Sequence, residues 1–228
     1  ICEGLVGSEM CIRDSINNDQ ESRIEQIISL QNSIETDPDF INIASLRSTP
    51  VFGDGSLQSE IVFIGEAPGY EEEVQKKPFV GPSGQLLAKI ITAMGLDRKQ
   101  IYITNILKYR PKVGDGNQGH GNRKPSSDEV KISINYLLQE INIINPKVII
   151  ILGGTAMEGL LNIKEPISSV RGKIHSFEGT KAIVTYHPSF LLRSKNQISD
   201  KRKVWEDMLI AMELLEMKIT DRQRAYFS

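Results

Sequence analysis

Four short runs of β-branched and apolar residues, separated by segments with helical spacing, constrain the fold of this chain more than any other feature. The runs cover residues 61–64, 101–104, 148–152 and 182–186. Such runs are typical of strands buried on both faces, and their alternation with helices indicates a parallel sheet between two helical layers. We therefore expect an α/β fold with three layers, α/β/α, around a central four-stranded parallel sheet.

Capping residues and breakers mark the ends of the expected helices. Ser126 and Glu129 have the spacing of a capping box, in which each side chain satisfies the other residue's free amide. Gly95 is expected to end the helix that begins at residue 83 or 84, because glycine readily adopts the left-handed conformation found at helix C-termini. Proline disfavours the helical conformation in the residue before it, so the first helix should end before Asp37-Pro38. The expected helices cover residues 17–36, 83–94 or 84–94, 126–145 and 198–217.

The 228 residues are expected to form one domain, 16–228, after a leader. Residues 1–15 have no usable period and no basic start of a secretory signal, and we expect a non-native or disordered leader. No apolar run approaches the ~18 to 20 residues of a membrane span, so we expect no membrane partner. The low cysteine count indicates an intracellular, cytoplasmic protein, and we expect a monomer. Cys2 and Cys11 both lie in the leader and are too few for a disulfide framework or a four-thiolate metal site.

The net charge of −2 conceals an uneven distribution of charge. Residues 1–40 hold nine acidic and two basic residues, residues 108–124 hold one and five, and residues 171–203 hold two and eight. Charge runs are usually solvated faces, but two basic segments are compatible with a surface that faces a polyanion.

Polar residues follow every expected strand. In an open parallel sheet, ligands bind beyond the carboxyl ends of the strands. A carboxylate, an amide, an imidazole, an aromatic ring and two glycine turns should therefore converge on one rim. The segments concerned are Gly65-Glu-Ala-Pro-Gly69, Pro78-Phe-Val-Gly81, Thr104-Asn105, Gly153-Gly154-Thr155 and His187-Pro-Ser189.

Six motifs, in this order and spacing, resemble the family 4 (type 4) group of the uracil-DNA glycosylase superfamily. They are GEAPG, PFVGPSGQLL, YITNILKYRP, NRKP, LGGTA and HPSFLLR, and the resemblance runs from about residue 51 to residue 214. It implies a uracil-DNA glycosylase-like fold and a monofunctional enzyme of base excision repair. Such an enzyme flips uracil out of single- or double-stranded DNA and hydrolyses its N-glycosidic bond, leaving an abasic site. This chemistry needs no metal or redox cofactor.

The residues of the rim suit uracil recognition. The Asn105 carboxamide offers an acceptor for uracil N3–H and a donor for O4, whereas cytosine presents the opposite pattern. Phe79 would stack on the flipped ring. By resemblance, one acid of the 71–73 run, Glu72, stands near uracil C5 and excludes thymine. The expected uracil-binding residues are Gly65, Glu66, Ala67, Glu72, Phe79, Asn105 and His187.

Bond cleavage places negative charge on uracil and positive charge on the deoxyribose. His187 is the candidate donor to uracil O2. Glu66 is the candidate carboxylate that stabilises the sugar and orients a water for attack at C1′. With Asn105, these are the expected catalytic residues. Each also has a purely structural explanation, such as core packing for Phe79 or a turn cap for Asn105, but accidents would not all fall on one rim.

DNA contacts are expected from a glycine turn, from hydroxyls and from basic residues. Gly153 and Thr155 open a helix whose amides could hold a phosphate. By resemblance, loop 190–193 enters the minor groove, with Leu191 as the wedge and Arg193 as a phosphate or groove contact. Ser83 and Ser189 are further candidates for a phosphate contact, and Lys108, Arg110, Arg123 and Lys195 are expected to add sequence-independent contacts.

The type 4 group usually carries four cysteines that hold a four-iron four-sulfur cluster. Motif alignment places these positions near Pro38, Ile41, Tyr109 and Ser133, and none of them is cysteine. We therefore expect no cluster and no other cofactor, with Tyr109 and neighbouring apolar residues filling the volume.

The segment 112–121 contains four glycines and predicts a mobile surface loop. Its His120 resembles the loop histidine of a related glycosylase branch that traps uracil covalently, but the basic signature of that branch is absent. The alternatives are therefore a non-cleaving or covalently trapping uracil-DNA binding protein, and an α/β enzyme that acts on free nucleotides. The 190–193 loop and the basic 171–203 segment favour a polymer over a free nucleotide.

Overall fold

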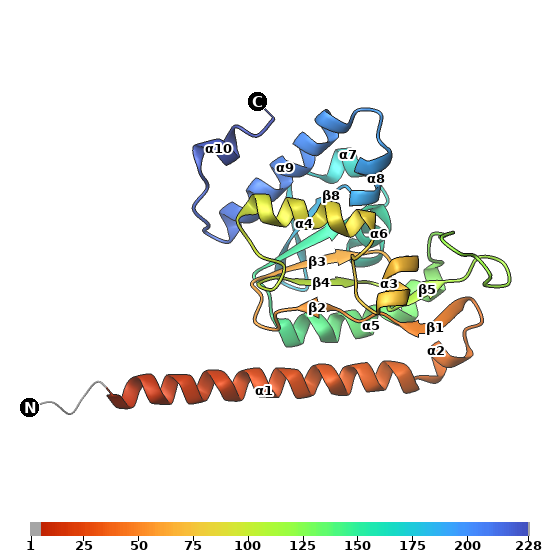
Figure 1. Ribbon diagram of the computed structural model, residues 1–228, viewed down its shortest axis with the longest axis horizontal. Coiled ribbons are helices and arrows are strands. Elements are labelled where there is room, and N and C mark those ends of the chain that lie inside the picture. Colours follow the sequence, from red (N-terminus) through yellow and green to blue (C-terminus); the bar gives the residue numbers. More distant parts are fainter. Residues whose placement is uncertain (1–5, 228) are drawn as a thin grey trace, which may run out of the picture.

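The computed structural model describes residues 6–227, with side chains from residue 19 onward (Figure 1). The helices are α1 (Val6–Thr36), α2 (Pro38–Asn42), α3 (Tyr70–Gln75), α4 (Pro82–Met94), α5 (Ser127–Ile144), α6 (Gly154–Leu161), α7 (Ile167–Val170), α8 (Pro188–Arg193), α9 (Gln197–Leu214) and α10 (Asp221–Arg224). The strands are β1 (Leu46–Pro50), β2 (Asp54–Gly55), β3 (Ile61–Gly65), β4 (Tyr102–Asn105), β5 (Tyr109–Pro111), β6 (Val148–Leu152), β7 (Ile174–Phe177) and β8 (Thr180–Thr185).

Within the described residues, six strands form one sheet in the order β2-β4-β3-β6-β8-β7. The four central strands are parallel, which confirms the predicted core of the sheet. The edge strands β2 and β7 pair antiparallel, and β1 and β5 form a separate ribbon. The sequence did not predict the two edge strands, because β2 has only two residues and only one of the four residues of β7 is buried, so neither carries a buried apolar run.

Alternate residues of the central strands face opposite helical layers. Val62 and Ile64 face a core built with α1, α2, α5, α6 and α7. Ile61 and Phe63 face a second core built with α4 and α9. Helix α1 packs on α5 and lies outside it, away from the sheet (Figure 1). The result is the expected α/β/α arrangement with one additional helix on its outer face.

The observed helix ends agree with the capping signals. The Ser126 side chain accepts from Glu129 N–H, and the Glu129 carboxylate accepts from Ser126 N–H. Gly95 ends α4 at a φ of 87°. Helix α1, however, begins at Val6 rather than Asn17, so residues 6–15 of the expected leader are helical. None of the described helices combines the length and apolarity that crossing a lipid bilayer requires.

Candidate functional site

A cleft of about 800 Å³ lies at the carboxyl ends of the parallel strands. Glu66 follows β3, Asn105 ends β4, Gly153 follows β6 and His187 follows β8, and all four line this cleft. The parallel register brings them together, because it sets Gly65 beside Asn105 and Leu152 beside Thr185. The lining also includes Ala67, Glu72, Phe79, Ser83, Ser189 and Arg193.

Asn105 presents a free carboxamide in the wall of the cleft. The residue is 3% exposed, and among the described residues no protein group forms a hydrogen bond with its carboxamide. Gly65 permits this placement, because a Cβ at that position would overlap both Asn105 Oδ1 and the Phe79 ring. The carboxamide is not among the fully buried unpaired groups of the described residues, so it is available to a ligand or water in the cleft.

Phe79 adopts a left-handed conformation with a φ of 55°. This is uncommon for a bulky residue and costs ~1 to 3 kcal/mol. Glu72 holds the loop in place, because Oε1 accepts from Val80 N–H (3.1 Å) and Gly81 N–H (2.9 Å) while Oε2 accepts from Gly69 N–H (3.1 Å). Glu72 therefore fixes both ends of the segment that carries Phe79. Its predicted contact with uracil C5 stays a prediction.

His187 caps α8 and is held in one tautomer. Its Nδ1 accepts from Ser189 N–H (3.1 Å) and lies 2.8 Å from Ser189 Oγ. Since Nδ1 is the acceptor, the proton of the neutral ring is on Nε2. Burial, together with the nearby Arg193, lowers the pKa of His187 to about 4. The ring, whose centroid is 5.7 Å from that of Phe79, is therefore a neutral donor near pH 7.

Glu66 is half-buried, and its carboxyl group lies in the cleft. Burial raises the pKa of Glu66 from its ordinary value, and the Thr155 hydroxyl and Lys124 ammonium partly oppose this shift. Thr155, predicted as a phosphate contact, thus interacts with this carboxyl group. The Glu66 carbonyl accepts from Leu107 N–H (3.1 Å), which ties the end of β3 to the chain after β4.

Residues 52–209 match the family model of the Uracil DNA glycosylase superfamily. The chain belongs to the uracil-DNA glycosylase superfamily. A type-4 uracil-DNA glycosylase of Thermotoga maritima is 41% identical over 165 residues, which cover 71% of this chain and 81% of the relative. The type-4 enzymes of Archaeoglobus fulgidus and Saccharolobus solfataricus are 38% and 41% identical, over 64% of this chain and 73% and 68% of their own. The predicted family resemblance is confirmed.

The conformation of α8 contradicts the predicted wedge role of Leu191. Leu191 is 1% exposed, so it cannot enter a groove as a wedge. Its neighbours Phe190 and Leu192 are 41% and 45% exposed. The reason is that residues 188–193 form a helix rather than an open loop, and one residue of the apolar triplet turns into the core. Phe190 lines the cleft and stacks on Tyr186 at 4.8 Å between ring centroids.

Three predicted basic contacts are engaged inside the protein. Lys108 and Arg110 are each 1% exposed and bind Glu140 and Glu73. Arg123 lines the cleft, but its guanidinium donates to both carboxylate oxygens of Glu129, at 2.6 and 2.9 Å. Most of the positive charge counted in residues 108–124 is therefore neutralised internally, which a sum over the sequence does not reveal. The predictions for Lys108 and Arg110 as surface phosphate contacts are therefore wrong, whereas the contact of Arg123, whose side chain is 31% exposed, stays a prediction.

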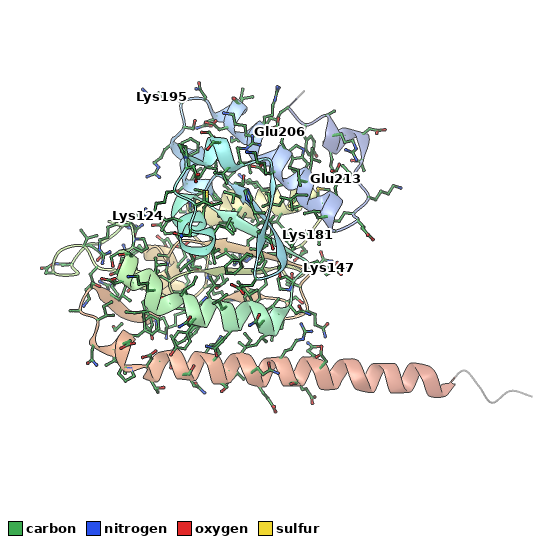
Figure 2. All side chains as sticks on the ribbon, turned by 180° about the vertical axis from the view of Figure 1, so that it is seen from behind. Lys124, Lys147, Lys181, Lys195, Glu206 and Glu213 are labelled. Carbon is green, nitrogen blue, oxygen red and sulfur yellow. The ribbon has the colours of Figure 1, made fainter. Side chains whose placement is uncertain are left out.

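Exposed lysines lie on both sides of the molecule. Figure 2 shows Lys124 and Lys195 on one side, and Lys147 and Lys181 on the other, near the amino ends of β6 and β8. Lys124 and Arg193 line the cleft, whereas Lys195 lies in the short connection between α8 and α9. The predicted contacts Arg193 and Lys195 thus remain accessible, and Lys124 joins them.

The glycine-rich segment 112–121 is anchored rather than free. Arg110 Nη2 donates to the carbonyls of Gly119 (2.7 Å) and Gly121 (2.8 Å), and Arg47 donates to Gly116 (2.6 Å). Both arginines bind Glu73. The segment brings His120 against Tyr70, at 4.2 Å between ring centroids, and both rings line the cleft. The sequence assigned no role to Tyr70, because its partners come from distant segments.

The four positions that carry cluster cysteines in the type 4 group do not fit an iron-sulfur cluster here. Pro38 and Ile41 offer no ligand atom, and Ile41 is exposed. Ser133 is buried, and its Oγ has no hydrogen-bond partner among the described residues. Tyr109 packs with Phe40 and, through it, Tyr136, at centroid distances of 5.1 and 5.6 Å. Of the two cysteines in the sequence, Cys2 and the side chain of Cys11 lie outside the part of the chain that the structure describes.

Proposed function

We propose that this protein is a uracil-DNA glycosylase that flips uracil out of DNA and hydrolyses its N-glycosidic bond, leaving an abasic site. The observation that carries the proposal is one cleft that joins a free carboxamide, a neutral imidazole donor, a half-buried carboxyl group and an aromatic ring. Type-4 uracil-DNA glycosylases related over most of their length support it. The cleft is complete within one chain, so the proposal requires no second copy.

Recognition rests on Asn105 and Phe79. The Asn105 carboxamide accepts from uracil N3–H and donates to O4. Cytosine offers an acceptor and a donor at these atoms, so an amide held in this orientation disfavours it. Phe79 stacks on the ring, which contributes ~1 to 3 kcal/mol and does not depend on the base. Glu72 keeps the Phe79 loop closed through its three backbone hydrogen bonds.

During cleavage, His187 stabilises the negative charge that develops on uracil, and Glu66 stabilises the positive charge on the deoxyribose. The C1′–N1 bond breaks with its electron pair passing to uracil, and His187 Nε2–H stabilises the negative charge at O2. The Glu66 carboxylate stabilises the positive deoxyribose and orients a water whose oxygen bonds to C1′. The proton of that water passes to Glu66 and then to solvent. Glu66 must therefore be ionised for the reaction to proceed.

We further propose Phe190, in place of Leu191, as the side chain that fills the space left by the flipped base. Phe190→Ala should lower the excision rate in duplex DNA more than in single strands, which have no helical gap to fill. Leu191→Ala should instead lower the free energy of unfolding by ~2 to 5 kcal/mol, because it empties a core position. Single-turnover excision on both substrates and urea unfolding test this pair. Equal rate losses on the two substrates would contradict the role of Phe190.

We also propose that the protein holds no iron-sulfur cluster. An aromatic group of Phe40, Tyr109 and Tyr136 occupies the region instead, and the Tyr136 hydroxyl donates to Asp37. Protein purified without oxygen should contain no stoichiometric iron and show no absorbance band near ~400 nm, which cysteine-ligated clusters give. Stoichiometric iron with such a band would refute this.

One assay tests the proposed function against its alternatives. The full chain, without added metal, is incubated with an oligonucleotide that contains one uracil, and alkali-labile abasic sites are measured. Cleavage is the expected result. Tight binding without cleavage would indicate a protein that only holds the flipped base, and release of uracil from free deoxyuridine nucleotides alone would indicate a nucleotide enzyme. DNA that stays bound through a denaturing gel would indicate covalent trapping. His120, which lines the cleft, would then be the candidate for the residue that forms the bond.

A further inference from the structure

A buried ion pair lies directly behind Asn105. The side chains of Lys108 and Glu140 are 1% and 5% exposed, and Lys108 Nζ lies 2.5 Å from Glu140 Oε2. Lys108 Nζ also donates to Thr104 Oγ1 (2.6 Å) and to the backbone carbonyl of Asn105 (2.9 Å). These three acceptors satisfy the three donors of the ammonium group.

Glu140 connects this pair to β4. It belongs to α5, and its Oε1 accepts from the Tyr102 hydroxyl (2.8 Å) while Oε2 accepts from the Thr104 hydroxyl (2.8 Å). Every polar atom of the group thus has a partner. A buried ion pair is weak evidence for stability, because well-packed apolar side chains often serve as well. Its position beside the base-recognising residue suggests another purpose.

We propose that Lys108 and Glu140 are positioning residues, which fix the backbone of Asn105 and so aim its carboxamide at the edge of uracil. The inference rests on the proposed function and deepens it. The ammonium closes the turn from Asn105 to Lys108 by its hydrogen bond to the Asn105 carbonyl.

The same turn supports the end of β3. Ile106 N–H donates to the Gly65 carbonyl (3.0 Å) and Leu107 N–H donates to the Glu66 carbonyl (3.1 Å). On its far side, the Lys108 carbonyl accepts from Val51 N–H (2.7 Å). A change in this turn therefore reaches the backbone of both the recognising amide and the proposed catalytic carboxylate.

The test needs a variant that removes the ammonium without leaving an unpaired buried charge. Lys108→Met alone would leave Glu140 as an unpaired buried charge, so we combine it with Glu140→Gln. The new amide can accept from the Tyr102 hydroxyl and donate to the Thr104 hydroxyl, while the Asn105 carbonyl loses its charged donor and keeps only the long 3.5 Å contact with Thr104. The matched control is Ile144→Ala. This change empties a buried position one turn further along α5, where the chain leads into the amino end of β6 and not into the cleft.

Single-turnover uracil excision is measured for the full chain, the double variant, Asn105→Ala and the combination of all three changes. We expect the double variant to lose ~10- to 100-fold in rate when Asn105 is present, which is the range for one hydrogen bond to a charged group. In the Asn105→Ala background the same two changes should cost less than ~2-fold, because there is no carboxamide left to misplace. Ile144→Ala should lower the melting temperature and leave the excision rate within ~2-fold of the parent.

Other outcomes overturn the inference. A loss of equal size in both backgrounds would mean that the pair acts through general folding, and no loss in the parent background would mean that it does not position Asn105. Both of these leave the proposed function intact, since the parent chain still excises uracil. A parent chain that releases no uracil would overturn the proposed function itself and this inference with it.

Discussion

His187→Ala should lower the rate of uracil excision by ~10²- to 10³-fold, the usual loss when one fixed donor to a developing oxyanion is removed. The ring is held by Ser189 with Nδ1 as acceptor, so Nε2–H is the donor. Its pKa of about 4 keeps it neutral across the physiological range. The loss should appear in single-turnover excision and not in DNA affinity, measured by fluorescence anisotropy at a fixed salt concentration.

The matched control is His175→Ala. His175 lies in β7, with its Nε2 3.1 Å from the Val170 carbonyl, and does not line the cleft. We expect its excision rate to stay within a few-fold of the parent. An affinity loss large enough to explain the slower excision of His187→Ala would assign His187 to DNA binding, against the proposed donor role.

Glu66→Gln should lower the excision rate by ~10²- to 10⁴-fold, the range of general acid–base contributions. The amide keeps the shape of the side chain but carries no negative charge and accepts no proton. Because the carboxylate is the active form and burial raises the pKa of Glu66, the parent rate should rise with pH through a midpoint above 4.5. In Glu66→Gln this acidic limb should disappear from the pH profile of single-turnover excision. A profile with the limb unchanged would assign the titration to another group.

The same substitution should make the protein more stable. A raised pKa means that the folded state holds the Glu66 proton more tightly than the unfolded state does. Stability is therefore lost as pH rises through the folded-state pKa. Glu66→Gln should raise the melting temperature near neutral pH, and the difference should shrink below the ordinary carboxyl pKa, where both states of the parent are protonated. A lower melting temperature at neutral pH would mean that the charge is stabilised in the fold.

Buried apolar runs and capping residues were enough to predict the central architecture. The run 148–152 became β6, and the Ser126–Glu129 pair opened α5, because both signals are local and agree with the packing. Strand β2 and the ribbon of β1 and β5 were not predicted, since their pairing depends on partners far away in the chain.

The sequence by itself determined which groups reach the cleft, because in a parallel sheet the residues that end each strand meet at one edge. Asn105, Glu66 and His187 follow from that rule alone. Only the tertiary structure decided what the surrounding residues do. Leu191 turns inward because a helix replaces a loop, and Lys108 stands behind Asn105 because a carboxylate from α5 reaches it. Burial and long-range ion pairs are properties of packing, and a charge count cannot separate a lysine that faces DNA from one that holds the site together.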